Sequence, residues 1–311
     1  MNKKYISLII SFIAIFFLSQ IFIKSEELLD TFFSTINLLF KNLFPSIFIF
    51  FIITDILNNY QFPYYLSNLL GNIFNKIFHL PKVASYIVFM SMTSGFPGNS
   101  KLILEALENK EIDDFDATRL LTMTHFSNPL FIIYSVGINF YHDKTLGIII
   151  LISHFITNFI VGFCFRNIYK NKNNYPKLKL KEPKPFMEVL KTSIANTFVI
   201  LTNVLGIIIF FSLITKTINL YLNLNTFSNI LINGLLEITN GLSILGNTNM
   251  PIIPSATLAT FFISFGGFSI HMQIMSILNK YSVNYYIYLI SRLMHAAISS
   301  IITFLILINI Y

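Results

Sequence analysis

The chain has 311 residues, of which 54% are hydrophobic and only 11% are charged, with a formal net charge of +7. Ordinary soluble domains carry about 25% charged residues, and apolar runs recur here along the whole length, with a mean hydropathy of +0.68. This composition excludes a soluble globular protein, and the lack of short segments with alternating polarity excludes a β-barrel. We therefore expect an all-α polytopic membrane protein.

Nine apolar segments are candidates for membrane helices: residues 5–23, 28–57, 83–92, 117–140, 146–165, 196–214, 229–245, 256–265 and 286–308. The first could be a secretory signal, but no small-x-small cleavage site follows it, so we expect a retained helix in residues 1–25. The second exceeds the length of one membrane crossing, and Pro45 is expected to split it. Residues 62–79 are amphipathic and are expected to lie flat at the interface.

Two of these segments, residues 83–92 and 256–265, are too short to cross a bilayer, which takes about 20 residues. Each precedes a glycine-containing break and a further short helical stretch. This pattern predicts two re-entrant helical hairpins, at residues 83–109 and 255–280. Irregular backbone at the tip of such a hairpin is stable at membrane depth only beside protein or a watery cavity.

A hydrophilic linker in residues 167–190 divides the chain into a first repeat, residues 26–166, and a second, residues 191–311. Between residues 167 and 185 this linker contains six lysines against Glu182 alone: Lys170, Lys172, Lys177, Lys179, Lys181 and Lys184. The positive-inside rule places it in the cytoplasm. The motifs "SGFPGNSK", from Ser94, and "GGFSIHMQ", from Gly266, match weakly between the halves. Interrupted segments at corresponding positions of two halves are typical of transporters.

The first break combines flexible backbone with a cation. Gly95 and Gly98 permit unusual backbone angles, and Asn99 or Ser100 can cap a new helix that places Lys101 in its first turn. A positive helix end beside a lysine is suited to bind a carboxylate or phosphate group. The alternative is that Lys101 extends to the interface and that the glycines only turn the chain.

The second break offers Gly267, Ser269, His271 and Gln273. The glycine lets a ligand approach the backbone, and the three side chains are neutral or weakly basic hydrogen-bonding groups. A histidine in a membrane segment favours a cavity. His271 either contacts a ligand or forms a purely structural hydrogen bond, and the sequence favours neither.

A third polar stretch, "THFSNPL", contains Ser127 and Asn128 beside Pro129, inside the predicted helix of residues 117–140. Proline removes a backbone hydrogen bond and disturbs the preceding turn. The two polar side chains either compensate a simple kink or contact a substrate.

A fourth stretch, "GLLEITNG", places Glu237, Thr239 and Asn240 in apolar surroundings. A carboxylate at membrane depth is expensive unless it is protonated or paired. We therefore expect Glu237 to be either a proton-coupling group or the partner of a cation such as Arg292 or Lys101.

The sequence gives little support to an enzyme. Ser269 and His295 suggest a serine hydrolase, but no glycine follows the serine, and the H-E-x-x-H motif of zinc proteases is absent. With no Cys/His cluster, we expect no catalytic residues, no metal and no cofactor. The net charge does not indicate nucleic-acid binding, since much of it lies in the linker.

Five motifs in order resemble one known family: "SGFPGNSKL", "THFSNPLFI", "GLLEITNG", "GGFSIHMQIMSIL" and "SRLMHA". The chain is similar, from about residue 28 to residue 308, to the sporulation integral membrane proteins of the YlbJ type, within the nucleoside-recognition or Gate domain proteins. The resemblance implies a fold like that of concentrative nucleoside carriers, with two helical hairpins meeting at a central site. It departs from the expected pattern at Asn99 and Ser100, where many relatives have Gly-Ala.

The resemblance also implies a function. The family is associated with endospore formation in Firmicutes and with moving dipicolinic acid, a small aromatic dianion, across a membrane of the developing spore. We therefore expect a multi-pass protein of the cell membrane, in the mother-cell or outer forespore membrane, that transports a small organic anion, with a coupling proton or sodium ion among its expected partners. The alternatives are a nucleoside or cation transporter and a sporulation membrane protein that transports nothing.

Overall fold

The computed structural model describes residues 3–169 and 182–311, which are largely helical and contain no strand. The helices are α1 (Lys3–Ile23), α2 (Ser25–Leu38), the π-helical η1 (Leu39–Leu43), α3 (Phe44–Asn59), α4 (Phe62–Phe78), α5 (Ala84–Ser94), α6 (Gly98–Glu108), α7 (Asp114–Met123), the π-helical η2 (Phe131–Phe140), α8 (Lys144–Cys164), α9 (Phe186–Tyr221), α10 (Thr226–Leu236), α11 (Ile238–Gly246), α12 (Ile252–Phe265), α13 (Gly267–Ile277) and α14 (Tyr285–Ile308). The all-α prediction is confirmed. Residues 170–181 of the predicted basic linker lie outside the described residues.

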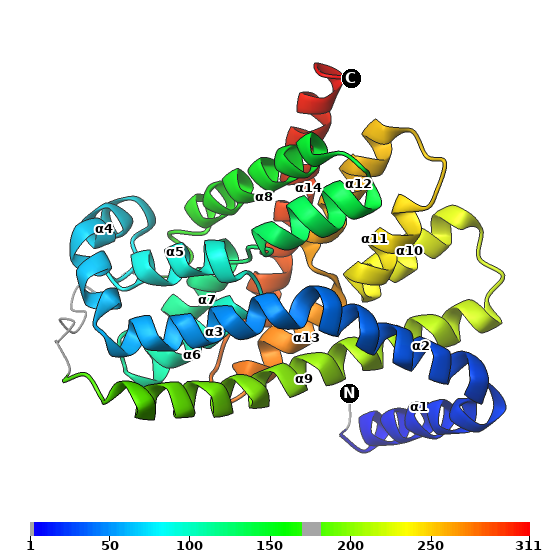
Figure 1. Cartoon of the computed structure of the whole chain (residues 1–311), viewed down its shortest axis with the longest axis horizontal. Helices are drawn as coiled ribbons and strands as arrows, with labels where there is room; N and C mark the ends of the chain where they lie inside the picture. The colour runs from blue at the N-terminus through cyan, green and yellow to red at the C-terminus, as the bar shows by residue number, and fades with distance from the viewer. Residues whose placement is uncertain (1–2, 170–181) are drawn as a thin grey trace.

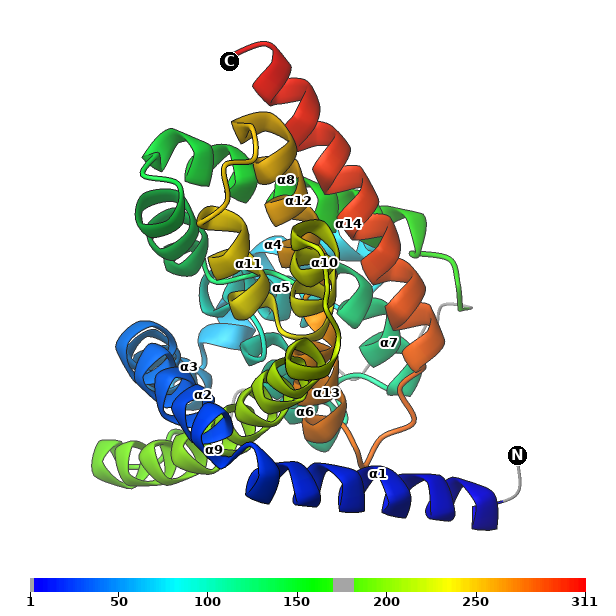
Figure 2. The same cartoon turned by 90° about the vertical axis from the view of Figure 1, so that its right-hand side faces the viewer.

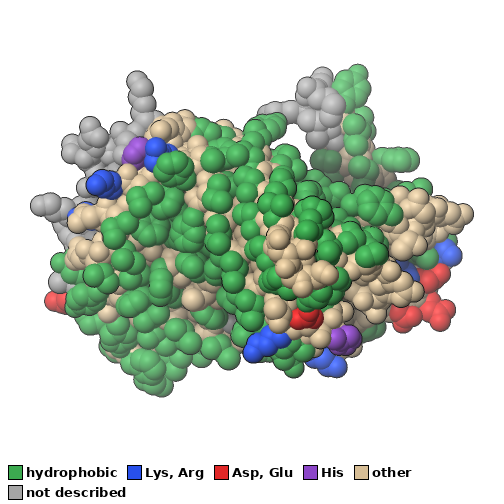
Figure 3. All heavy atoms as spheres, turned by 90° about the horizontal axis from the view of Figure 1, so that it is seen from above, with side chains coloured by type: hydrophobic (Ala, Val, Ile, Leu, Met, Phe, Trp, Pro, Cys, Tyr) green, Lys and Arg blue, Asp and Glu red, His purple; other side chains and the backbone are tan. Residues whose placement is uncertain are grey.

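Four helical elements in the described part of the chain are long and apolar enough to cross a membrane: α8, α9, the α12–α13 pair taken together (Ile252–Ile277) and α14. A fifth candidate joins α1 to α2 across a bend of 99°. Figure 3 shows that hydrophobic side chains cover most of the face seen from above, with charged ones near its margins. These features confirm a multi-pass membrane protein.

Two long elements pack side by side along one flank of the molecule (Figure 1). One is the continuous run of α2, η1 and α3; the other is α9, and small apolar clusters such as Leu39 with Val204 and Ile208 join them. The pair is antiparallel, because Asn59 at the end of α3 accepts a hydrogen bond from the backbone N–H of Lys184, just before α9 begins. The expected interruption near Pro45 takes the form of the π-helical turn that directly precedes this proline.

Helices α5 and α6 form an antiparallel pair. Tyr86, near the start of α5, and Glu105, near the end of α6, both hydrogen-bond to Asn58 of α3. At the opposite end of the pair, an added Cβ on Gly98 would lie only 2.6 Å from Ser94 Oγ. The turn between them therefore contains Gly95, Phe96 and Pro97.

The predicted helix of residues 117–140 is two helices. Helix α7 ends at Met123, residues 124–128 are not helical, and η2 continues from Phe131. Pro129 lacks an N–H, and the polar neighbours of this proline form the non-helical segment. The break is therefore complete, and not the kink that the sequence left open.

The predicted second hairpin, residues 255–280, is not observed. Helices α12 and α13 follow one another end to end as one 26-residue candidate span, interrupted at Gly266 with φ of +91°. Instead, residues 229–245, expected to form a single segment, contain two helices. α10 and α11 lie side by side in both Figure 1 and Figure 2, with Glu237 at the turn between them.

The same order of elements recurs in the two halves. An antiparallel pair, an interrupted helix and a long helix follow one another as α5/α6, α7–η2 and α8, and again as α10/α11, α12–α13 and α14. The predicted match between Ser94 and Gly266 is therefore wrong. The former ends a helix at a hairpin turn, whereas the latter interrupts a helix that continues. The main apolar core lies among these elements.

Candidate functional site

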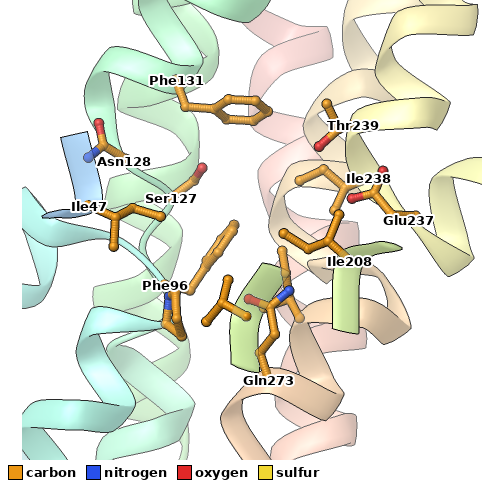
Figure 4. Close-up of a pocket in the computed structure, with 13 residues that line it drawn as sticks. Ile47, Phe96, Ser127, Asn128, Phe131, Ile208, Glu237, Ile238, Thr239 and Gln273 are labelled. Carbon is orange, nitrogen blue, oxygen red and sulfur yellow. The ribbon is translucent and has the colours of Figure 1, made fainter. Parts of the chain in front are cut away.

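A small cavity lies where the two hairpin turns approach the two helix breaks (Figure 4). Its volume is about 40 Å³. Polar groups come from the α7–η2 break (Ser127, Asn128), the α10/α11 turn (Glu237, Thr239) and α13 (Gln273). Apolar walls come from Ile47, Phe96, Pro97, Phe131, Val204, Ile208, Ile238 and Ile270. Five of the predicted site residues thus meet at one place.

The turn of the α5/α6 pair is fixed to the first break. The backbone N–H of Phe96 donates to the carbonyl oxygen of Phe126 at 2.8 Å. Gly95 has a φ of +71°, and a Cβ there would lie 2.4 Å from the backbone nitrogen of Asn128. Only glycine permits both this backbone angle and this approach. The turn consequently brings Phe96 and Pro97 to the cavity.

The turn of the α10/α11 pair packs against the second break. Gly267, with φ of +63°, approaches Ile238 so closely that a Cβ would lie 3.3 Å from its side chain. Glu237 is 2% exposed and accepts a hydrogen bond at 2.9 Å from the backbone N–H of Asn240. It therefore caps the N-terminus of α11 with a carboxylate, as helix termini favour.

Two polar groups in the cavity wall have no hydrogen-bond partner among the described residues. They are the hydroxyl of Ser127 and the side-chain nitrogen of Gln273, and both residues are at most 2% exposed. A buried polar group without a partner costs about 1–3 kcal/mol. Both groups lie in the wall of the cavity, where water or a solute can satisfy them.

A network of histidines holds the two breaks. His154 of α8 accepts the backbone N–H of Ser127 at its Nε2 atom (2.9 Å) and meets the hydroxyl of Ser264, near the end of α12, at its Nδ1 atom (2.9 Å). Because Nε2 accepts, the proton of the neutral ring lies on Nδ1 and is donated to Ser264. One imidazole therefore bridges both interrupted helices.

Arg292 of α14 completes this network without an acidic partner among the described residues. Its guanidinium is fully buried and donates to the carbonyl oxygen of Thr122 in the last turn of α7 and to His295 Nδ1. His295 in turn donates from Nε2 to the carbonyl of His154. A cation at a helix C-terminus is favourable, so Arg292 stabilises the end of α7. The predicted alternative of a Glu237–Arg292 bridge is not observed.

Lys101 does not line the cavity. Its ammonium group is buried and pairs with Asp55 of α3, and it lies 3.8 Å from Glu105 and 4.9 Å from the centre of the Phe51 ring. Asp55 and Glu105 also line a second, larger cavity of about 540 Å³, whose walls include Glu108 and Tyr86. The sequence pattern predicted an external anion at Lys101, whereas in the structure an internal carboxylate partners this lysine.

The other predicted residues have local roles. Ser100 donates to the carbonyl of Pro97 (2.6 Å), Asn99 lies 3.4 Å from Thr124 Oγ1, and Asn240 donates to Ser212 (3.2 Å). His271 meets the carbonyl oxygen of Phe265 at 3.0 Å, which favours the structural alternative for this residue. Ser269 is buried with no partner atom among the described residues.

Several cavity residues had no recognisable sequence signal. Phe96 and Pro97 lie inside a motif that was singled out, but Ile47, Val204 and Ile208 are three apolar residues in a chain that is 54% hydrophobic. Only packing selects them. The described residues contain no group of three or more His, Cys, Asp or Glu side chains placed to bind a metal ion.

Comparison with known proteins finds similarity to a family model and to one curated protein. Residues 40–143 match the family model described as "Nucleoside recognition", the Gate domain, which includes the α5/α6 turn and the first break. The fold defines a polytopic helical membrane protein, and residues 40–143 are similar to the Gate domain.

The chain is also 26% identical to the "Sporulation integral membrane protein YlbJ" of Bacillus subtilis (strain 168), across 84% of this chain and 73% of that protein. The resemblance to proteins of the YlbJ type is thereby confirmed. No solved structure matches the chain.

Proposed function

We propose that this protein is a transporter that carries a small solute across a membrane during endospore formation. The observation that carries the proposal is the convergence of Ser127, Asn128, Glu237, Thr239 and Gln273 on one cavity between two hairpin turns and two helix breaks. Broken helices and paired interrupted segments near a central site are typical of transporters. The name of the Bacillus subtilis relative supports the link to sporulation.

The proposed mechanism is movement of the hairpin turns against the long helices. A cavity of about 40 Å³ holds only a few waters, at about 10–15 Å³ each, so the hairpin turns would have to move to admit a larger solute. The α5/α6 and α10/α11 pairs, each inserted into the membrane as a re-entrant hairpin, would separate from α3 and α9 to admit the solute. The two halves would act as structural repeats, as in concentrative nucleoside carriers.

Dipicolinic acid, the substrate that the family resemblance implies, is the first candidate. Among the described residues, Glu237 is the only charged side chain in the cavity wall, and it repels a dianion when ionised. We therefore propose that the anion enters only with a coupling proton on Glu237 or with an accompanying cation such as sodium, since an unpaired like charge at membrane depth is costly.

A nucleoside is the second candidate, and the wall of the cavity favours it. Gln273 and Ser127 supply free hydrogen-bonding groups, Glu237 supplies an acceptor, and the rings of Phe96 and Phe131 flank the space. Uncharged hydrogen-bonding groups between aromatic rings suit a neutral heterocycle.

Uptake by purified protein in liposomes tests the proposal. Labelled dipicolinate and uridine are compared with and without a pH gradient, for the wild type and for E237Q, which keeps the cap but not the charge. If dipicolinate is the substrate, uptake depends on the pH gradient or on a cation, and E237Q removes that dependence. Uptake of uridine alone selects the second candidate. Uptake of neither solute contradicts the proposal for these substrates and favours a sporulation membrane protein that transports nothing.

A further inference from the structure

Helix α4 has a second apolar face that points away from the core. Tyr65, Leu69, Ile73 and Ile77 recur every four residues and are all exposed, with Leu69 at 72%. Residues four apart lie on one face of a helix, while Leu66 and Phe78 pack inward in the main core. An exposed apolar face on a membrane protein is suited to contact lipid.

An apolar groove lies between the last residue of α4 and α8. The groove has a volume of about 510 Å³ and is lined by Phe78, Ile156, Phe159, Ile160, Phe163 and Cys164. Except for Phe78, these residues belong to the second half of a helix long enough to cross the membrane. The groove is therefore open to the acyl chains of the bilayer.

A basic rim closes one end of the groove. Arg166 lies two residues beyond α8, and its guanidinium carbon is 3.7 Å from the centre of the Phe163 ring, which lines the groove. The same guanidinium donates to the carbonyl of Ile77 (3.3 Å), and the exposed Lys76 precedes Ile77 in the chain. Residues 62–84 and 144–169 contain no Asp or Glu. Arg119 donates to the backbone carbonyl of Arg166, and the carboxylate of Asp116 is already paired with Arg119.

We propose that this groove and its rim bind one anionic phospholipid. An acyl chain lies along the groove, and the headgroup phosphate lies between Arg166 and Lys76. Arginine binds phosphate through several N–H groups at once, and the aliphatic part of each basic side chain covers apolar surface while its charge stays at the interface. Each basic residue near an anionic bilayer surface favours binding about fivefold. The proposal is independent of what the central cavity transports.

The absence of tryptophan from the chain permits a direct test. F163W places a single fluorescent reporter in the groove. F304W places one on α14, at an exposed phenylalanine in a helix with no basic residue in its last turn. Each variant is reconstituted in phosphatidylcholine vesicles with a small fraction of dibrominated phosphatidylglycerol or dibrominated phosphatidylcholine, and quenching is measured.

We expect brominated phosphatidylglycerol to quench F163W more strongly than brominated phosphatidylcholine does, and both lipids to quench F304W equally. Adding R166Q and K76Q to F163W removes the preference. Adding K144Q, at the opposite end of α8, keeps it, and R166K with Lys76 intact retains most of it.

Equal quenching of F163W by the two lipids overturns the proposal, as does a preference that survives R166Q with K76Q. Loss of the preference on adding soluble glycerol phosphate overturns it too, because the site then needs no acyl chain.

Discussion

The ammonium group of Lys101 in α6 forms a buried ion pair with the carboxylate of Asp55 in α3. The two side chains are 6% and 13% exposed, and their residues lie 46 positions apart. The pair fixes the α5/α6 hairpin to the long helix that flanks it. The sequence pattern predicted an anion site at this lysine. In the structure the lysine instead joins α6 to α3, two elements that the proposed mechanism separates.

Replacing Lys101 by methionine leaves Asp55 as a buried charge with no cation. Breaking one side of a buried pair costs about 3–5 kcal/mol; we expect the lower end, because Asp55 keeps some exposure. The thermal unfolding temperature of K101M in detergent should therefore fall clearly. The Michaelis constant for uptake should change little, since Lys101 does not line the cavity.

The double variant K101M/D55L is the control for this prediction. Replacing both partners by apolar groups is often neutral, so unfolding should return towards the wild-type temperature. A K101M protein of normal stability that no longer binds an anionic substrate would contradict the structural role and restore the predicted anion site.

Gly95 is the position where the α5/α6 turn is least tolerant. Alanine there meets the backbone nitrogen of Asn128 at 2.4 Å and takes a φ of +71°, and no flexible side chain can move aside. We expect G95A to lose the contact between the turn and the first break, with a loss of roughly 1–3 kcal/mol from the backbone conformation alone and strongly reduced uptake. Thermal unfolding and uptake measure the two effects.

Gly206 of α9 is the matched control, because a Cβ at that position meets nothing within 4 Å. G206A should leave uptake unchanged and raise stability by up to about 1 kcal/mol, since alanine favours helix. If G95A and G206A had the same stability and uptake, the turn would tolerate a side chain. That result would contradict the close approach of Gly95 to the backbone nitrogen of Asn128.

Glu105 gives a pH dependence with a defined sign. It lies in the last turn of α6, at the end of the pair away from the hairpin turn, where it faces the second cavity with its side chain 30% exposed. Burial raises its pKa from 4.5 to about 7, with Lys101 opposing and Asp55 adding to the shift. The folded state therefore binds the proton more tightly than the unfolded state. Its contribution to stability is fully present below pH 4.5 and is lost as the pH rises through 7.

Measuring thermal unfolding at about pH 5 and about pH 7.5 checks this dependence. The drop in unfolding temperature with rising pH should be smaller in E105Q than in the wild type, because glutamine does not titrate and still accepts the hydrogen bond from Asn58. An identical pH dependence in both proteins would mean that Lys101 keeps Glu105 ionised throughout this range.

The polar breaks could be located from the sequence because their signals are local. Glycine, proline and polar residues interrupt apolar runs at Gly95, at Asn128 and at Glu237, and all three places border the cavity. The all-α class could also be predicted, because it follows from composition.

The pairing of the elements could not be predicted in this way. Gly266 and Gly267 look like a hairpin turn, but their positive φ values interrupt a helix that continues in the same direction. Conversely, Glu237 alone marks a true reversal inside an apolar run. The partner of Lys101 was also hidden, because its contact with Asp55 depends on how α3 packs against α6.

His154 offers the sharpest test of how the two breaks are connected. H154L removes both hydrogen bonds of the imidazole and leaves the N–H of Ser127 and the hydroxyl of Ser264 without that partner. Each buried group left unpaired costs about 1–3 kcal/mol. We expect amide hydrogen exchange to rise both in residues 124–130 and in residues 262–268, and uptake to fall.

Asn158, one turn further along α8, provides the matched control. It is equally buried but reaches only the first break, where it donates to the carbonyl of His125 at 3.0 Å. N158L should therefore raise exchange in residues 124–130 and leave residues 262–268 protected. If H154L gives this one-sided pattern as well, the imidazole supports a single break. A rise at both breaks in H154L alone means that one neutral histidine couples the interrupted helices of the two halves, because no other side chain with hydrogen bonds to both breaks is seen in the described residues.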